Sequence, residues 1–433
     1  MPRCIALAAL LCFVPLTYGG DPPPPNPKHV VDYVQWANDT VGRGVADNAA
    51  DLYREAAAGM KHREELLVLA IGSGAWKWSE EQRQALQQYV QSSALSLERF
   101  ESASKKRQCF LPIEGAAGFL LGARPAGLPQ IHDLSRLVAG RARLRALAGD
   151  VDASLRDVAL LLRVADHMQS GPLLIEYMLG LAIDTLAYEV LLDLPLLAPG
   201  RVDYGRVPAK LAALDTPLPD LTGQFRLERI GMWDYAQRAV QDTDGDGRYD
   251  LVSTAGPGHR YILRTELDPP VTLREMIAQI DGFYDQYQKV FSLGYADARR
   301  RAKELDEKAR AADTTVLGTL SPSLAGFVTM PRKVMATRCA YRVVYALHAH
   351  RDRHGDWPKV LSDALSAPSG EKQKLSDPFS GQPLGYRLKE GQPLVYSVGV
   401  DGVDSGGEVR RKGGRITWGA EGGDYVFWPR PVD

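Results

Sequence analysis

Apolar residues recur at every third or fourth position through most of residues 29–315, which is the spacing of one face of an α-helix. In residues 47–60 the predicted buried face consists of Ala50, Tyr53, Ala57 and Met60. Asp47 precedes this helix as a candidate N-cap, because a short polar side chain there can accept a bond from a free backbone amide. Residues 79–100 begin with Ser79 and an acidic first turn, which is also typical of a helix N-terminus.

The most strongly helical stretch spans residues 134–194. Small residues lie where two helices would pack closely, at Ala142, Gly149 and Ser154. The spacing around "GDVDASL" resembles one tetratricopeptide-type hairpin of about 34 residues, with no second copy at the same period. Because a single repeat cannot bury its own faces, the pattern indicates either a helical array or an antiparallel bundle.

The pattern changes after residue 315. A charged helical pattern over residues 272–311 ends before "TLSPSLAG" (319–326), which we interpret as a linker. A last helix is predicted over residues 333–355, and short strand-like runs follow it: "LGYRL", "LVYSV", "RITW" and "YVFW". The predicted fold is therefore mainly α, with a helical domain over residues 29–315 and a small α+β domain over residues 330–433.

The N-terminus has the layout of a secretory signal peptide over residues 1–20. Arg3 is followed by 13 apolar residues from Cys4 to Leu16, which are too few to span a bilayer comfortably, and then by small residues. A proline-rich spacer, residues 21–28, comes next. We expect export to the periplasm, the cell envelope or the extracellular space, with no stable membrane span in the mature chain. An uncleaved anchor is the alternative.

Composition removes some classes of partner. The 52 Lys and Arg residues balance 53 Asp and Glu residues, so nothing predicts nucleic acid as a partner. Two of the four cysteines lie in the predicted signal peptide, which leaves Cys109 and Cys339 in the mature chain. These two form either a disulfide or a pair of separate thiols.

The stretch "DTDGDGRYD" has the spacing of a calcium-binding loop. Aspartates occupy positions 1, 3, 5 and 9 of such a loop: Asp242, Asp244, Asp246 and Asp250. Ser253 stands where an EF-hand needs a bidentate Glu, so this is not an EF-hand. We predict a calcium-binding turn here, and a solvated Asx-type turn is the alternative.

Four motifs follow one another near the C-terminus: "GDWP", "DPFSG", "YSVGVDG" and "GGDYVFWP". In this order they resemble the C-terminal domain of type II secretion pseudopilins, over about 95 residues. The layout of the whole chain also resembles exported bacterial proteins that have no assigned activity. Because roughly 300 residues precede the domain here, whereas pseudopilins carry their assembly helix at the extreme N-terminus, pilus assembly is not implied.

The pseudopilin resemblance implies a structural calcium ion in the loop after the "YSVGVDG" strand. The ligands it implies are the carbonyl of Val398 and the carboxylates of Asp401, Asp404 and Asp424. Such hard oxygen ligands suit calcium. About 20 residues separate Asp404 from Asp424, which is a departure from the family pattern and makes Asp424 the least certain ligand.

Catalytic motifs are missing from the sequence: it contains no phosphate-binding loop, HExxH, CxxC or Gly-x-Ser-x-Gly pattern. "HAHRDRH" offers His348, His350 and His354, for which we expect a solvated helix surface, while His62 and His167 stand alone in the sequence. We therefore predict a non-enzymatic exported scaffold that binds a protein partner and carries a calcium-braced C-terminal domain. The alternative is an exported carbohydrate-active hydrolase with carboxylates in the helical domain and a sugar cleft lined by Trp76, Trp78 and Trp233.

Overall fold

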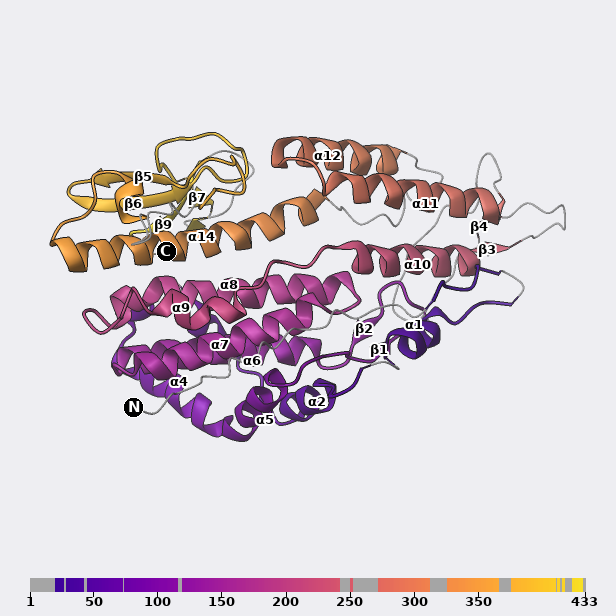
Figure 1. The fold of residues 1–433 in the computed structure, drawn as a ribbon. Coiled ribbons are helices and arrows are strands. Elements are labelled where there is room, and N and C mark those ends of the chain that lie inside the picture. Colours follow the sequence, from indigo (N-terminus) through magenta and orange to yellow (C-terminus); the bar gives the residue numbers. More distant parts are fainter. Residues whose placement is uncertain are drawn as a thin grey trace, which may run out of the picture.

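Helices make up most of the described chain, as the periodicity predicts, and small antiparallel sheets complete it (Figure 1). The structure is a computed structural model. It describes residues 20–26, 29–42, 45–72, 74–115, 119–241, 250–251, 272–311, 325–365, 375–409, 411–412, 415–416 and 423–430. None of the helices in these ranges is both long enough and apolar enough to cross a bilayer.

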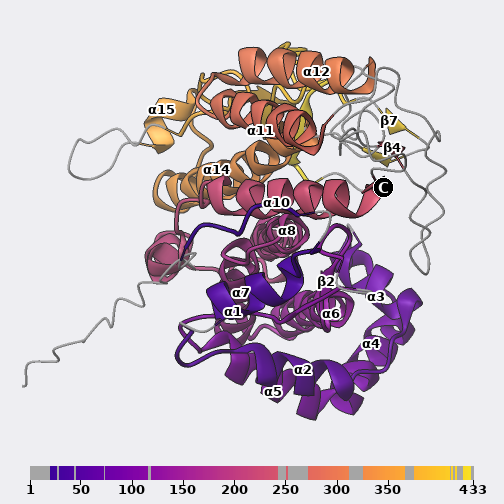
Figure 2. The same ribbon diagram turned by 90° about the vertical axis from the view of Figure 1, so that its right-hand side faces the viewer.

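The first helices are short, and α2 to α5 form an arc around α6 (Figure 2). Their bounds are α1 (Tyr33–Gly42), α2 (Ala50–Ala58), α3 (Glu64–Ile71), α4 (Glu80–Ser92) and α5 (Ala94–Ser104), with a 3₁₀ helix at Ala75–Lys77. Ser79 caps α4 as predicted, because its side chain accepts a bond of 3.2 Å from the Gln82 amide. Asp47 is not a cap: it adopts φ +56° and binds Lys106 Nζ at 2.5 Å, so α2 begins later, at Ala50.

Three long helices form the centre of the molecule: α6 (Leu128–Leu147), α7 (Val151–Gln169) and α8 (Leu174–Leu197). Gly149, which the sequence suggested as a helix-packing position, instead adopts φ +84° in the turn between α6 and α7. Gly180 allows α7 and α8 to approach closely, because a Cβ there would lie 2.6 Å from the Gln169 backbone nitrogen. Ala142 and Ser154 are fully buried, as expected for small residues between packed helices.

Further helices build on α8: α10 and α14 pack against it, and α11 and α12 pack on the other side of α10 and α14 (Figure 1). The bounds of the helices after α8 are α9 (Val207–Leu211), a 3₁₀ helix at Ala212–Leu214, α10 (Thr222–Ala239), α11 (Leu273–Val290), α12 (Tyr295–Ala311) and α14 (Ala325–His354). The helical pattern over residues 272–311 is two helices, because the chain turns between Phe291 and Gly294. The Tyr287 hydroxyl binds Asp306 at 3.0 Å and so joins α11 to α12.

The C-terminal part packs a three-stranded antiparallel sheet against α14. The sheet order is β5 (Gly385–Lys389), β6 (Gln392–Ser397) and β9 (Tyr425–Trp428), close to three of the four predicted strand runs. The remaining short elements are α15 (Leu361–Ala364) and three two-stranded pairs: β1 (Ile113–Glu114) with β2 (Arg124–Pro125), β3 (Val240–Gln241) with β4 (Asp250–Leu251), and β7 (Arg411–Lys412) with β8 (Arg415–Ile416). The buried residues of this sheet and those of the helices form one continuous hydrophobic core.

A buried ion network also joins the sheet to the helices. Arg430, just after β9, donates to Asp193 of α8 at 2.8 Å and pairs with Glu189. Arg143 of α6 binds the other oxygen of Asp193 at 2.9 Å and the carbonyl of Ala70 at 2.9 Å. Because Asp193 has no exposed surface, these two guanidinium groups supply the charge compensation that burial requires.

The described part of the proline-rich spacer lies against α10. Arg226 donates to the carbonyl of Gly20 at 2.6 Å, and the Tyr33 hydroxyl donates to the carbonyl of Pro23 at 2.7 Å. Gln237 binds the backbone on both sides of residues 27–28, accepting from the amides of Asn26 and Val31. The segment is therefore hydrogen-bonded to the helical part over residues 20–26.

Candidate functional site

The loop after β6 holds the residues that the pseudopilin resemblance implies. Asp377, in the "DPFSG" turn, fixes the start of this loop: its carboxylate accepts from the amides of Val398 at 2.9 Å and Phe379 at 3.0 Å. Burial raises the pKa of Asp377, while these backbone bonds lower it. Asp377 was not predicted as a functional residue, although an Asp-Pro pair beside a strand end is a recognisable turn signal.

Asp424 lies immediately before β9, on the opposite side of the same loop. It is 2% exposed, and its carboxylate accepts from the amides of Ser405 at 3.1 Å and Gly407 at 2.5 Å. Burial is the main cause that raises the pKa of Asp424, and the negative charges of Asp404 and Asp401 raise it further. The backbone bonds act in the opposite direction.

The other two carboxylates brace the loop locally. Asp404 accepts from the Tyr396 hydroxyl at 3.0 Å and from the Gly406 amide at 2.8 Å. Asp401 accepts from the Val403 amide at 3.1 Å, which forms an Asx-type turn. The structure thus brings Val398, Asp401, Asp404 and Asp424 into one loop, as the resemblance implied.

Helix α12 anchors this loop to the helical part. Tyr295 and Arg299 both donate to the carbonyl of Val400, each at 3.0 Å. The Tyr295 ring also makes an edge contact with Phe379, with ring centroids 4.8 Å apart. The position of the loop therefore depends on the helical part as well as on the sheet.

The oxygen ligands of the loop are of the types that calcium prefers, but they are not arranged around one point. Carboxylate and carbonyl oxygens are the ligands that calcium prefers, and mutual repulsion of the three carboxylates is what a cation would relieve. Within the described ranges, however, no three His, Cys, Asp or Glu side chains converge as a metal centre. Backbone amides and a tyrosine hydroxyl donate to the carboxylates of Asp401 and Asp404 instead, so calcium binding would require these side chains to rearrange.

The second predicted calcium loop falls mostly outside the described residues. Asp242, Asp244 and Asp246 lie there, and their calcium site stays a prediction. Asp250 begins β4, where its backbone pairs with Gln241 of β3 in an antiparallel hairpin. This pair lies in the part of the chain that connects α10 and α11.

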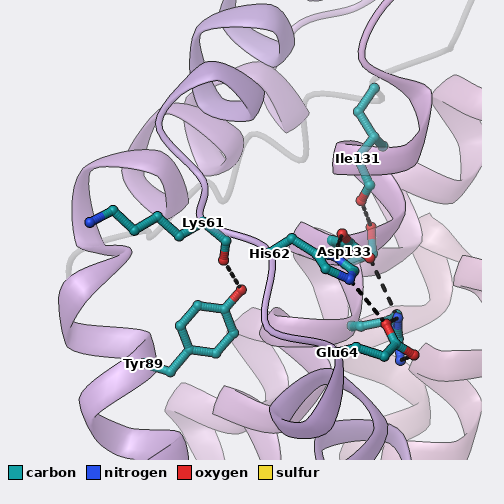
Figure 3. A network of polar contacts seen from close by, with 8 residues as sticks. Lys61, His62, Glu64, Tyr89, Ile131 and Asp133 are labelled. Atoms are coloured by element: carbon teal, nitrogen blue, oxygen red, sulfur yellow. Dashed lines mark hydrogen bonds and ion pairs between the residues drawn. The ribbon is translucent and has the colours of Figure 1, made fainter.

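His62 is not alone in the structure but belongs to a polar network between the segment before α3 and helix α6 (Figure 3). Its Nδ1 lies 2.6 Å from Asp133 Oδ2, and Arg136 makes two bonds of 3.0 Å to Glu64. The bond from Arg136 is the main cause that lowers the pKa of Glu64. The nearby Tyr89 hydroxyl donates to the Lys61 carbonyl at 2.6 Å and not to His62, so the network acts as a clasp between elements.

Two further histidines are buried or enclosed. His167 Nε2 lies 3.0 Å from the Lys106 carbonyl, which can only accept, so Nδ1 accepts from the Tyr53 hydroxyl at 2.9 Å. His348 was expected on a solvated helix surface, and this expectation is wrong. Its ring is half-buried among Tyr204, Trp357 and Trp428, at centroid distances of 4.6, 5.0 and 5.1 Å.

The two cysteines of the predicted mature chain are both free thiols. Cys109 is buried in the core of the helical part. Cys339, on α14, is half-buried and donates to the Ser376 carbonyl at 3.5 Å, and burial raises its pKa to about 11. The structure therefore decides the open alternative in favour of separate thiols.

An apolar cleft of about 700 Å³ lies where the helical and C-terminal parts meet. Both parts line it: α8, the start of α12 and α14 on one side, and the "DPFSG" turn on the other. Its aromatic and methionine side chains are Tyr177, Phe291, Tyr295, Phe327, Met335 and Phe379. The volume falls in the range of ligand-binding clefts.

Comparison of the chain with protein-family models, with curated proteins and with solved structures gave no match in any of the three. The class that the structure itself defines is a mainly helical protein with small antiparallel sheets.

Proposed function

We propose that this is an exported, non-enzymatic scaffold in which a helical part carries a pseudopilin-like C-terminal domain, and that a protein partner binds in the cleft between them. The observation that carries the proposal is the shared apolar cleft of about 700 Å³. Met335 at this cleft is 43% exposed, so part of its apolar side chain is accessible to a partner. Aromatic residues and methionine are the residue types enriched in the centres of protein interfaces.

The two walls of the cleft are held in a fixed relation, which favours binding. Arg430 and Arg143 meet at Asp193, and Tyr295 and Arg299 hold the loop carbonyl of Val400. A preformed cleft avoids the conformational entropy that a mobile one would lose on binding. The scaffold role also agrees with the close packing of α6 and α7 on either side of a short turn.

Calcium bracing is the second element of the proposal. It is supported by the clustering of Asp401, Asp404 and Asp424 around one loop and by the effect of the first two on the pKa of the third. We propose that calcium fixes this loop and has no catalytic role. Export rests on the sequence pattern of residues 1–20 alone, with the first 19 residues outside the described ranges.

The hydrolase alternative has less support. Asp220 and Asp297 line the apolar cleft, but both are exposed, and Asp297 pairs with Arg300 at 2.6 Å. The tryptophans predicted to line a sugar cleft pack against the hydrophobic core: Trp76, Trp78 and Trp233. A glycosidase needs a raised-pKa acid opposite a second carboxylate, and the apolar cleft does not offer that pair among its described residues.

The test is site-specific photo-crosslinking in the envelope fraction of cells that make the protein. A photoreactive phenylalanine analogue at position 335 should give a discrete crosslinked species. The matched control is position 360, where Val360 is 53% exposed and lies outside the cleft. No discrete species at position 335, or the same species at both positions, would contradict the proposed binding surface.

A further inference from the structure

A small cleft lies beside α10, away from the loop and the apolar cleft described above. It has a volume of about 180 Å³ and is formed by α10, the start of α8 and residues 120–124. Most of its wall is aliphatic, from Leu120, Leu121, Leu173, Ile175 and Leu227. One carboxyl group, that of Glu228, is among the described residues that line it.

Glu228 has neither a hydrogen bond nor an ion pair with another described residue. The arginines next to it on α10 are engaged elsewhere. Arg226 binds Gly20 and Asp21, and Arg229 binds Asp285 at 2.9 Å. Arg124 lines the rim of the cleft, but its side chain is exposed to solvent.

The other ionisable groups around the cleft are also engaged or buried. Glu176 accepts from the Leu173 amide at 3.0 Å, and Asp234 accepts from the Leu120 amide at 2.8 Å. The buried Tyr284 hydroxyl has no hydrogen-bond partner within the described structure; burial raises its pKa, and the charge of Glu228 raises it further. Glu228 is therefore a half-buried carboxyl in an aliphatic cleft with no counter-ion.

We propose that this cleft binds a small aliphatic ammonium group, with the Glu228 carboxylate as its counter-ion and the leucine and isoleucine side chains around its methylene chain. An aminobutyl group offers one ammonium for the single carboxylate and a methylene chain for the aliphatic wall. The group comes either from a free amine or from a lysine side chain of another protein, since the recognised chemistry is the same. The inference is independent of the partner cleft at Met335.

Binding is coupled to proton release. Burial raises the pKa of Glu228 to about 7, so a large fraction of this carboxyl is protonated near neutral pH. An ammonium group favours the ionised form and expels the proton. The affinity therefore rises with pH, by about tenfold or more between pH 5.5 and 8.

Isothermal titration of the purified protein with n-butylammonium at pH 8 tests the inference. We expect saturable binding, at least about tenfold weaker binding of 1-butanol, and a loss of about tenfold or more in Glu228→Gln. The matched control Glu81→Gln changes an exposed glutamate on α4 and leaves binding unchanged. If Glu228→Gln does not fold, Ile175→Trp at the rim of the cleft, where Ile175 is 38% exposed, should block binding instead.

A second probe, Nα-acetyl-lysine methylamide, distinguishes the two sources of the ammonium group. Tighter binding of this probe indicates a lysine of a protein partner, and tighter binding of butylammonium indicates a free amine. Three results would overturn the inference: equal binding of 1-butanol and butylammonium, unchanged binding in a folded Glu228→Gln, or no binding of butylammonium at concentrations about tenfold above the millimolar range.

Discussion

Buried carboxylates are compensated differently in the helical core and in the C-terminal loop. In the core, Asp193 lies between Arg143 and Arg430, both within 2.9 Å. In the loop, Asp424 accepts bonds from backbone amides, and two further carboxylates lie close enough to raise its pKa. The charge of Asp193 is therefore compensated by arginine, whereas the loop keeps an excess of negative charge that a cation would balance.

Aspartate-to-asparagine substitution at Asp193 and at Asp424 tests this difference most directly. Asp193→Asn leaves two buried guanidinium groups without their counter-ion, and we expect a loss of about 3–5 kcal/mol in the free energy of unfolding. Asp424→Asn keeps an acceptor for the loop amides and removes repulsion, so we expect a loss of about 1 kcal/mol or less without calcium. Urea unfolding with unchanged m-values measures both. Equal losses would show that the two environments do not differ as described.

Glu228 is a third case, because it is a carboxyl of the helical part that has no arginine partner. Burial raises its pKa from 4.5 to about 7, so between these values the folded state binds more protons than the unfolded state. Its contribution to stability is therefore fully present below pH 4.5 and is lost as the pH rises through about 7. Glu228→Gln should match the wild type near pH 4.5 and exceed it by about 2 kcal/mol at pH 8.

Other groups contribute to the same pH profile, so the difference between the two proteins is the quantity to measure. Burial raises the pKa of Glu176 to about 8, which acts in the same direction. Burial lowers the pKa of His167 and of His348 to about 4, so their contribution is lost as the pH falls below 6.5. A difference between wild type and Glu228→Gln that stays constant from pH 4.5 to 8 would contradict the assignment to Glu228.

The smallest expected effect is at the clasp in Figure 3, where His62 is exposed. His62→Ala removes the contact with Asp133, but Arg136 still pairs with Asp133 and with Glu64. We expect a loss of about 1 kcal/mol in the free energy of unfolding. His354→Ala, at an exposed position of α14, is the control and should cost less than about 0.5 kcal/mol. A loss as large as that of Asp193→Asn would place the clasp among the core networks.

Sequence periodicity predicted the helical class and the strands β5, β6 and β9, because both depend on local patterns of burial. It placed a helical hairpin around "GDVDASL" but gave Gly149 a helix-packing role, whereas Gly149 forms the turn after α6 in a left-handed backbone conformation. The sequence also gave no sign that Arg143, at a position typical of a solvated helix, is almost fully buried.

In the candidate sites, too, the sequence predicted local contacts and missed contacts between distant segments. The motifs indicated that Asp401, Asp404 and Asp424 share one loop, because family motifs encode local turns. Asp193 and Arg430 are 237 positions apart, and only the packing of the sheet against the helices brings them together. The Glu228 cleft likewise combines α10 with two distant segments, so no local pattern could have predicted it.

The most direct test of the account is the thermal unfolding of the protein with calcium and with a chelator, for the wild type, Asp401→Ala and Asp242→Ala. If the C-terminal loop is the calcium site, calcium at about 100 times its dissociation constant should stabilise the wild type by about 2.7 kcal/mol. This stabilisation should vanish in Asp401→Ala and persist in Asp242→Ala. Stabilisation lost only in Asp242→Ala, or none in millimolar calcium, would contradict the assignment of the cation to the C-terminal loop.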